Sequence, residues 1–352
     1  MSNVATPSPA DQYEAKIRPV RYWLYFLSFL VLMMVLVGGA TRLTDSGLSI
    51  TEWKPISGAI PPLTLEEWNA EFDLYRQIPE YQQINKGMSL EEFKFIFWWE
   101  WGHRFLGRLI GFAFLIPFVV FLVQKRLDWK LAPALFTLFL LGGFQGFLGW
   151  WMVSSGLTER VDVSQYRLAA HLGAACILLL ALTWVARRLR PKTVMWVQSG
   201  WKPLIWAFVL LIYVQIIAGA FVAGIDAGFS HNTWPLMAGK FIPEGLTTLK
   251  PWWLNSFENI VTVQFNHRML AYVITAFLVG LTWHAWSKTQ FDGVHGWMVV
   301  IAGLTVLQVI LGILTLLWVV PIHLALAHQI TAFLLCAAGV AYLADMSNEK
   351  SG

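Results

Sequence analysis

Long apolar runs alternate with short polar stretches along the chain, and this alternation constrains the fold more than any other feature. About 20 consecutive apolar residues are enough to cross a membrane as a helix. The runs that reach this length are residues 22–42, 95–123, 133–153, 165–186, 204–224, 259–283, 297–317 and 321–343. The sequence therefore predicts an all-α integral membrane protein with eight transmembrane helices.

The composition supports a membrane protein and excludes several other classes. Of the 352 residues, 57% are hydrophobic and only 13% are charged, whereas a soluble domain has about a quarter charged residues. The basic residues stand in short loops, so their excess does not indicate a nucleic-acid partner. The polar start of the chain contains Asp11 and Glu14, unlike a cleavable signal or transit peptide. Cys176 and Cys336 fall inside apolar runs, which predicts buried thiols rather than disulfides.

The charged loops predict an orientation in the bilayer. Three clusters of basic residues lie on one predicted side of the membrane. They are Lys16, Arg18 and Arg21, then Lys125, Arg126 and Lys130, then Arg187, Arg188, Arg190 and Lys192. The opposite side holds the acidic loop 43–94. The positive-inside rule therefore predicts cytoplasmic N and C termini, in a bacterial inner membrane. Helix-start signals on the outer side are Ser89 with Glu92, Asp162 or Ser164, and Pro321.

The second half of the chain repeats the first. The string GGATRLTDSGLS from Gly38 matches GAFVAGIDAGFS from Gly219. Further aligned pairs are His103 with His267, Gln145 with Gln308, Gly149 with Gly312, and His171 with His328. Four spans per half keep both halves in the same orientation. We therefore predict two pseudo-symmetric four-helix bundles, residues 22–190 and 191–345, between cytoplasmic tails 1–21 and 346–352.

Each half carries two histidines inside its second and fourth predicted helices: His103 and His171, then His267 and His328. All four lie about 10–12 Å from the outer end of their helices. One membrane histidine can simply hydrogen-bond a neighbouring helix, but four at equivalent depths favour a function. Paired imidazoles on facing helices bind haem iron, and neighbouring glycines and alanines leave room for a porphyrin. The sequence predicts two haem sites.

One carboxylate distinguishes the two predicted haem sites. Glu100 precedes His103 by one helical turn, whereas the aligned residue before His267 is Gln264. Two electron-carrying haems would not need this difference. It favours an enzyme in which one haem is the substrate and the other a fixed cofactor. The alternative interpretation is a structural carboxylate paired with a neighbouring arginine, Arg104 or Arg167.

Two arginines at outer helix ends are candidates for binding haem propionates. Arg42 ends the first predicted helix and Arg167 begins the fourth. A guanidinium group binds a carboxylate through two parallel hydrogen bonds, which suits a propionate. The alternative is that both side chains extend to the lipid headgroups.

These motifs resemble those of the haem A synthase family. The resemblance rests on GGATRLTDSGLSITEWKP, the ExxHR string around His103, AAH at His171, NHR at His267 and AHQ at His328. It covers the chain from about Arg21 to Ala344. It implies oxidation of a methyl substituent of the substrate haem O to the formyl group of haem A, through successive hydroxylations. Some family members have a cysteine pair in the first outer loop. Loop 43–94 has none, so the chain resembles the proteobacterial and mitochondrial branch.

The resemblance also implies roles for individual residues. His103 and His171 would flank haem O, and Glu100 would be the catalytic acidic residue beside it. His267 and His328 would ligate haem b as cofactor. Implied partners are the membrane lipid, a haem O synthase, an electron acceptor and oxidase assembly proteins, with a homo-oligomer left open.

Two other functions remain open from the sequence. A dihaem b-type cytochrome would move electrons without altering either haem, and Glu100 would then be dispensable. A haem carrier for oxidase assembly would hold at least one haem loosely and make no product. Both share the histidine pairs, so only the chemistry at the first pair separates them from a synthase.

Overall fold

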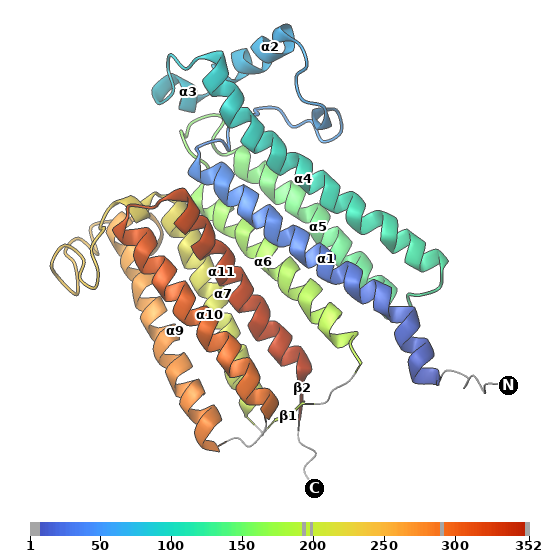
Figure 1. The fold of residues 1–352 in the computed structure, drawn as a ribbon. Helices are drawn as coiled ribbons and strands as arrows, with labels where there is room; N and C mark the ends of the chain where they lie inside the picture. Colours follow the sequence, from blue (N-terminus) through green and yellow to red (C-terminus); the bar gives the residue numbers. More distant parts are fainter. Residues whose placement is uncertain (1–7, 192–194, 198–199, 289–291, 349–352) are drawn as a thin grey trace.

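The computed structural model describes residues 8–191, 195–197, 200–288 and 292–348, and these residues are almost entirely helical (Figure 1). Eight helices within them are long and apolar enough to span a membrane. They are α1 (Pro9–Leu43), α4 (Leu90–Val123), α5 (Leu131–Val153), α6 (Gln165–Arg188), α7 (Trp201–Gly224), α9 (Ile260–Lys288), α10 (Asp292–Leu317) and α11 (Ile322–Asp345). The predicted all-α, eight-span membrane protein is confirmed.

Helix starts follow local capping as well as the apolar pattern. The predicted capping box at Ser89 and Glu92 is present and begins α4. A second capping box, Ser8 with Asp11, begins α1 well before its apolar run, so most of the predicted tail 1–21 is helical. Residues 1–7 and 349–352 of the predicted tails lie outside the described residues. Pro321 occupies the position directly before α11.

The predicted side-chain cap of α6 is wrong. Ser164 occupies the capping position, but its side chain makes no capping hydrogen bond. Asp162 instead lies with a carboxylate oxygen 3.8 Å from Arg42. The physical reason is that Arg42 offers this carboxylate a full positive charge, whereas the start of α6 offers only a partial one.

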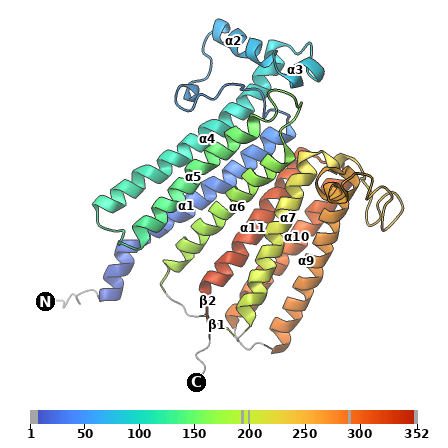
Figure 2. The same ribbon diagram turned by 180° about the vertical axis from the view of Figure 1, so that it is seen from behind.

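Four helices meet at the centre of the molecule. Helices α1, α6, α7 and α11 pack together, with α4 and α5 flanking them on one side and α9 and α10 on the other (Figures 1 and 2). Glycines permit the close approach: a Cβ added at Gly173 would lie 2.6 Å from Ile217, and one at Gly339 would lie 2.6 Å from Val209. Small residues are typical of such membrane interfaces. Cys176 and Cys336 are buried here as free thiols, as predicted.

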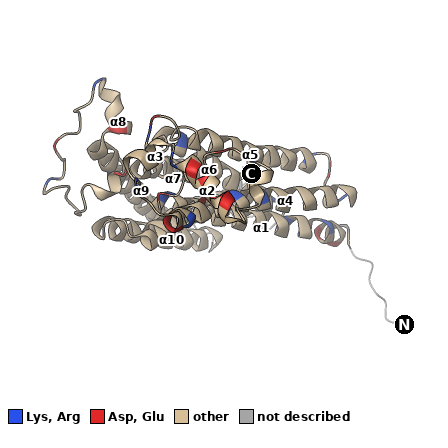
Figure 3. Ribbon diagram, turned by 90° about the horizontal axis from the view of Figure 1, so that it is seen from above, with Lys and Arg blue, Asp and Glu red and all other residues tan. Residues whose placement is uncertain are grey.

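Polar contacts join the two halves of the chain at both ends of the bundle. At the end that holds the termini, Arg187 of α6 pairs with Asp345 of α11. Strand β1 (Met195–Val197) runs parallel to β2 (Met346–Asn348) beside them. At the opposite end, Arg42 pairs with Asp226 at 3.0 Å. Seen from above, acidic and basic residues gather mainly near helix ends and loops, while most of the helical ribbon carries neither (Figure 3).

The chain between α1 and α4 forms an outer cap, defined here as residues 44–89. It contains the helices η1 (Ser57–Ala59), α2 (Leu65–Tyr75) and α3 (Pro79–Gln83). Together with the first turns of α4 it builds a separate core, of Leu48, Ile50, Trp68, Phe72, Tyr75, Ile78, Phe93, Ile96, Phe97 and Val163. The corresponding connection in the second half contains only η2 (Ala227–Phe229), η3 (Trp252–Leu254) and α8 (Asn255–Glu258).

Candidate haem sites

The structure brings the four predicted histidines together in two pairs. His267 of α9 and His328 of α11 have ring centres 6.5 Å apart. His171 of α6 is close enough to His103 of α4 to interact electrostatically. A metal–imidazole bond is about 2 Å long, so two imidazoles that share one iron have ring centres about 6 Å apart. The second pair is separated as a haem iron would require.

A glycine on a neighbouring helix faces each of these histidines. Real Cβ atoms essentially never come closer than 3.0 Å to another heavy atom, and the added Cβ atoms are at or near this limit. The distances are 3.0 Å from Gly38 to His103, 3.3 Å from Gly149 to His171, 3.2 Å from Gly219 to His267, and 2.8 Å from Gly312 to His328. These glycines are aligned in the sequence repeat. The same backbone approach therefore occurs at matching positions of the two halves.

Buried amides lie close to the second histidine pair. Gln215 donates from Nε2 to the His267 carbonyl at 3.0 Å. Nδ1 of His328 lies 3.2 Å from the Gln308 carbonyl. A His328 tautomer that donates from Nδ1 keeps Nε2 as the lone-pair nitrogen that can bind a metal. Several buried polar atoms have no hydrogen-bond partner among the described residues. They include Gln145 Nε2 and Oε1, His171 Nδ1, Gln215 Oε1 and Gln308 Oε1.

The donor set suits haem better than a bare metal ion. Structural zinc sites use four protein ligands, and catalytic zinc sites use three. No group of three or more His, Cys, Asp or Glu side chains that could hold a metal occurs among the described residues. Each histidine pair offers two nitrogens, which is the number that a porphyrin-bound iron still accepts. The residues therefore fit haem.

Glu100 is buried, with only 2% of its surface exposed, and its carboxylate accepts four hydrogen bonds. Arg104 donates to Oε1 from Nη2 at 2.6 Å and from Nε at 3.1 Å. Ser49 Oγ and the Ile50 amide donate to Oε2 at 2.8 Å and 2.7 Å. The pair with Arg104 that the alternative interpretation expected is present. Through their bonds to Ser49 and Ile50, Glu100 and Arg104 tie α4 to the outer cap. The catalytic role of Glu100 stays a prediction.

The second half has the same arrangement without the negative charge. Gln264 accepts from Arg268 at 3.1 Å and donates to the Ala227 carbonyl at 2.8 Å. Each arginine also donates to two loop carbonyls, from Arg104 to Ile50 and Glu52, and from Arg268 to His231 and Thr233. The two sites therefore share their scaffold and differ in charge at one aligned position.

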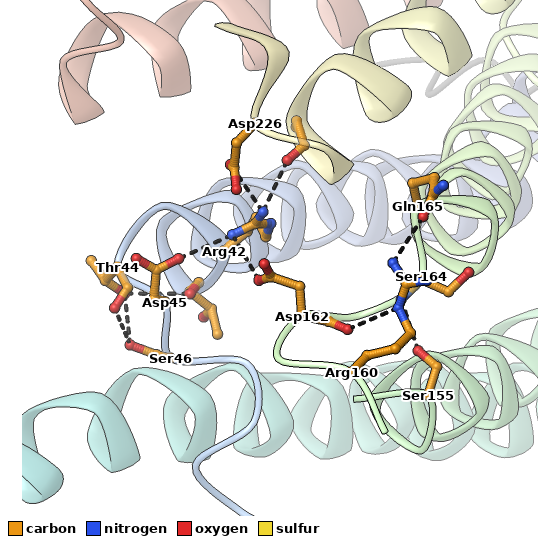
Figure 4. Close-up of polar contacts among 12 residues, drawn as sticks. Arg42, Thr44, Asp45, Ser46, Ser155, Arg160, Asp162, Ser164, Gln165 and Asp226 are labelled. Atoms are coloured by element: carbon orange, nitrogen blue, oxygen red, sulfur yellow. Dashed lines mark hydrogen bonds and ion pairs between the residues drawn. The ribbon is translucent and has the colours of Figure 1, made fainter. Parts of the chain in front are cut away.

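The two arginines proposed for propionate binding both have protein partners. Arg42 lies among three carboxylates at the outer end of the bundle, 3.0 Å from Asp45, 3.0 Å from Asp226 and 3.8 Å from Asp162 (Figure 4). Arg167 donates to the Trp151 carbonyl and to Ser154 Oγ, and its guanidinium lies over the Trp151 ring. Their contact with propionates stays a prediction.

Comparison with known proteins shows the family to which the chain belongs. Residues 21–340 match the COX15-CtaA family, described as cytochrome oxidase assembly proteins. The chain belongs to this family. It is 54% identical to a haem A synthase of Parvibaculum lavamentivorans, over 94% of this chain and 95% of that protein. It is 50% identical to one of Azorhizobium caulinodans, over 95% of both chains. A haem A synthase of a Chelativorans species is 52% identical, over 92% of this chain and 90% of that protein.

Some site residues of this family member were not predicted from its sequence. The repeat aligned Gly38 with Gly219, but nothing in the pattern indicated that these glycines face histidines. Ser49 also belongs to the aligned strings, yet its bond to Glu100 depends on how the outer cap folds back. Gln215 has no sequence signal, because the residue aligned with it in the first half is Met34.

Gly312→Ala is expected to reduce haem bound at the second pair. The added Cβ would lie 2.8 Å from Cε1 of His328, so the imidazole must move. Alanine favours a helix over glycine by about 1 kcal/mol, so weakened α10 is not the cause. Haem per protein, measured by visible absorption after purification, should fall. Gly303→Ala in the same helix has nothing within 4 Å of its Cβ and is the matched control. Equal haem content in both variants would contradict the proposed contact.

Glu80 of α3 should make the outer cap less stable as the pH rises. Glu80 is 5% exposed, and its Oε2 has no hydrogen-bond partner among the described residues. Burial raises the pKa of its carboxyl to about 8. The unfolded chain keeps the ordinary pKa of 4.5, so between these values only the folded form retains the proton. Stability therefore falls with rising pH in this window, by up to about 1.4 kcal/mol per pH unit.

Glu80→Gln removes this titration while preserving the shape of the side chain. The variant's unfolding temperature should exceed that of the parent by more at pH 8 than at pH 5, measured in lipid nanodiscs. Glu66→Gln, at an exposed position of α2, is the control and should show no such pH dependence. A gain from Glu80→Gln that is equal at both pH values would refute the proposed ionisation.

Proposed function

We propose that the chain is a haem A synthase that oxidises a methyl substituent of haem O to a formyl group in a bacterial inner membrane. The observation that carries this proposal is a difference in charge between two sites that share a scaffold. Glu100 and Gln264 occupy the same position beside a histidine and an arginine, and only Glu100 is charged. The names of the most similar relatives support the same reaction.

In this proposal the first pair, His103 and His171, holds the substrate haem O, and the second pair holds haem b. The spacing of His267 and His328 and the glycines that face both pairs support these assignments. Haem b, when bound, supplies a redox centre that takes up electrons one at a time. The protein's part is to hold both groups at fixed positions within the helical bundle.

The proposed reaction produces protons, and in this proposal Glu100 receives them. Conversion of a methyl group and one water molecule to a formyl group releases four protons and four electrons. Ser49 Oγ donates to Glu100, so a proton can pass between this hydroxyl and the carboxylate. Arg104 holds the carboxylate in place from its other side. The four electrons would pass to an electron acceptor.

Mass analysis of extracted haems tests this proposal. The protein is produced in cells that make haem O, purified, and its haems are extracted. A synthase yields hydroxylated or formyl haem. Two unaltered haems that stay bound would indicate the b-type cytochrome, and one loosely held, unaltered haem would indicate the carrier. Either of these results would overturn the proposed function.

A further inference from the structure

The first stretch of the outer cap turns back along the side of α4. We call residues 50–65 the outer strap. Arg108, one helical turn beyond Arg104, donates from Nε to the Pro55 carbonyl at 2.9 Å and from Nη2 to the Lys54 carbonyl at 3.0 Å. Figure 1 shows the strap's short helix η1 beside α4 rather than above the bundle. The strap therefore extends toward the interior of the membrane-spanning region.

The depth of the strap follows from the helix contacts. Gly38 faces His103, and α1 ends at Leu43, about 7 Å further outward. The Cα atom of Arg108 lies about 7 Å further inward along α4 than that of His103. Its guanidinium donates to the strap. A Cβ added at Gly58 would lie 3.2 Å from Nη2 of Arg108. The middle of the strap thus lies below the outer end of α1.

The backbone of the strap is adapted to a place where water is scarce. Irregular backbone at membrane depth needs hydrogen-bond partners from the protein, since lipid tails offer none. Arg104 and Arg108 supply donors to the carbonyls of Ile50, Glu52, Lys54 and Pro55. Proline has no amide hydrogen to satisfy, and the strap contains three prolines, Pro55, Pro61 and Pro62. From Pro55 to Leu65 it has no charged residue.

The side chains of the strap continue the apolar surface of α4. Ile56, Ile60 and Leu63 are 87%, 70% and 75% exposed. On α4, Phe112 and Ile116 are exposed along the segment that follows Arg108. That segment belongs to a membrane span, so its exposed face is in contact with lipid. The exposed aliphatic side chains of the strap belong to the segment that Arg108 holds against α4.

We propose that the outer strap is a re-entrant element whose partner is the bilayer. Ile56, Ile60 and Leu63 insert among the acyl chains of the outer leaflet beside α4. The strap also contacts α5, because Trp53 packs against Trp150 with ring centres 6.5 Å apart. The second half has Tyr272 at the position aligned with Arg108, so its loop receives one arginine instead of two. This inference does not depend on the proposed reaction.

Site-directed spin labelling in lipid nanodiscs tests the proposal. Single cysteines replace Ile56 and Ile60, and the native cysteines give little background because both are buried. The labels should show a several-fold higher ratio of accessibility to oxygen, which partitions into lipid, than to a water-soluble nickel complex. Ile116→Cys on α4 is the lipid reference, and Asn69→Cys on α2 is the aqueous reference. Values equal to those of Asn69→Cys would overturn the proposal. Shielding from both reagents would indicate a protein partner and would overturn it too.

Arg108→Gln provides a second measurement on the same labels. Loss of the two carbonyl bonds should move the Ile56→Cys label toward the aqueous reference, while the label at Ile116→Cys stays unchanged. Arg108→Lys retains a cation and part of the donor capacity, so its effect should be smaller. If the Arg108→Gln variant leaves the Ile56→Cys label at the lipid reference, Arg108 does not hold the strap, and this part of the proposal is wrong.

Discussion

His328→Ala is expected to remove the stably bound haem of the second bundle and, with it, formation of haem A. His328 shares the pair with His267 at a ring-centre distance of 6.5 Å, and its Nδ1 is oriented by the Gln308 carbonyl. Alanine leaves the iron with one protein ligand. The absorption spectrum of the purified protein should lose the bands of a haem held by two imidazoles.

A matched control and a rescue make this result specific. His323→Ala changes an exposed histidine one turn earlier on α11 and should keep the haem spectrum. Free imidazole added to the His328→Ala variant should restore part of the two-imidazole spectrum, because it can replace the missing side chain. A spectrum that is unchanged by His328→Ala would mean that this histidine does not bind the iron.

The helical architecture was largely predictable, since apolar run length depends only on local composition. Seven of the eight helices begin within about five residues of the predicted starts. The exception is α1, whose first turns are polar and follow the Ser8 capping box instead of the apolar pattern. The capping of α6 was mispredicted because Asp162 is drawn to Arg42, a residue far away in the sequence. Such a long-range pairing leaves no local signal.

The histidine pairing was predictable for a different reason. A repeated sequence places equal residues at equal depths, and parallel helices in a bundle bring them face to face. The same argument does not apply to the outer cap, which has no counterpart of similar length in the second half. The bonds from Ser49 and Ile50 to Glu100 and the position of the outer strap depend on this cap, so neither followed from the sequence pattern.

The structure changes how the asymmetry at Glu100 is understood. From the sequence, Glu100 was expected either as the catalytic acidic residue beside the substrate haem or as a carboxylate paired with an arginine. In the structure, both of its oxygens are hydrogen-bonded, to Arg104 on one side and to Ser49 and Ile50 on the other. If Glu100 accepts a proton in the proposed reaction, the Ser49 hydroxyl that donates to it can pass that proton on, and Ser49→Ala should share part of any defect caused at Glu100.

Glu100→Gln is expected to reduce haem A formation by about a hundredfold or more, which is the usual contribution of a positioned proton acceptor. Haem content should remain close to that of the parent protein. The second half supports a loss of product without a loss of haem, because Gln264 occupies the aligned position and bonds to Arg268 and to the Ala227 carbonyl. In Glu100→Gln the amide oxygen can keep the Arg104 bonds, but the acceptor for the Ile50 amide is lost as well as the negative charge.

The reciprocal variant, Gln264→Glu, is the matched control for this prediction. It places a carboxylate beside Arg268, so the second half gains the charge that the first half loses in Glu100→Gln. If the charge acts on the substrate haem, Gln264→Glu should retain most product formation and Glu100→Gln should not. Both are measured by mass analysis of extracted haems, with haem content recorded from the absorption spectrum. Product formed by Glu100→Gln at the parent rate would show that the carboxylate serves only to hold the outer cap on α4.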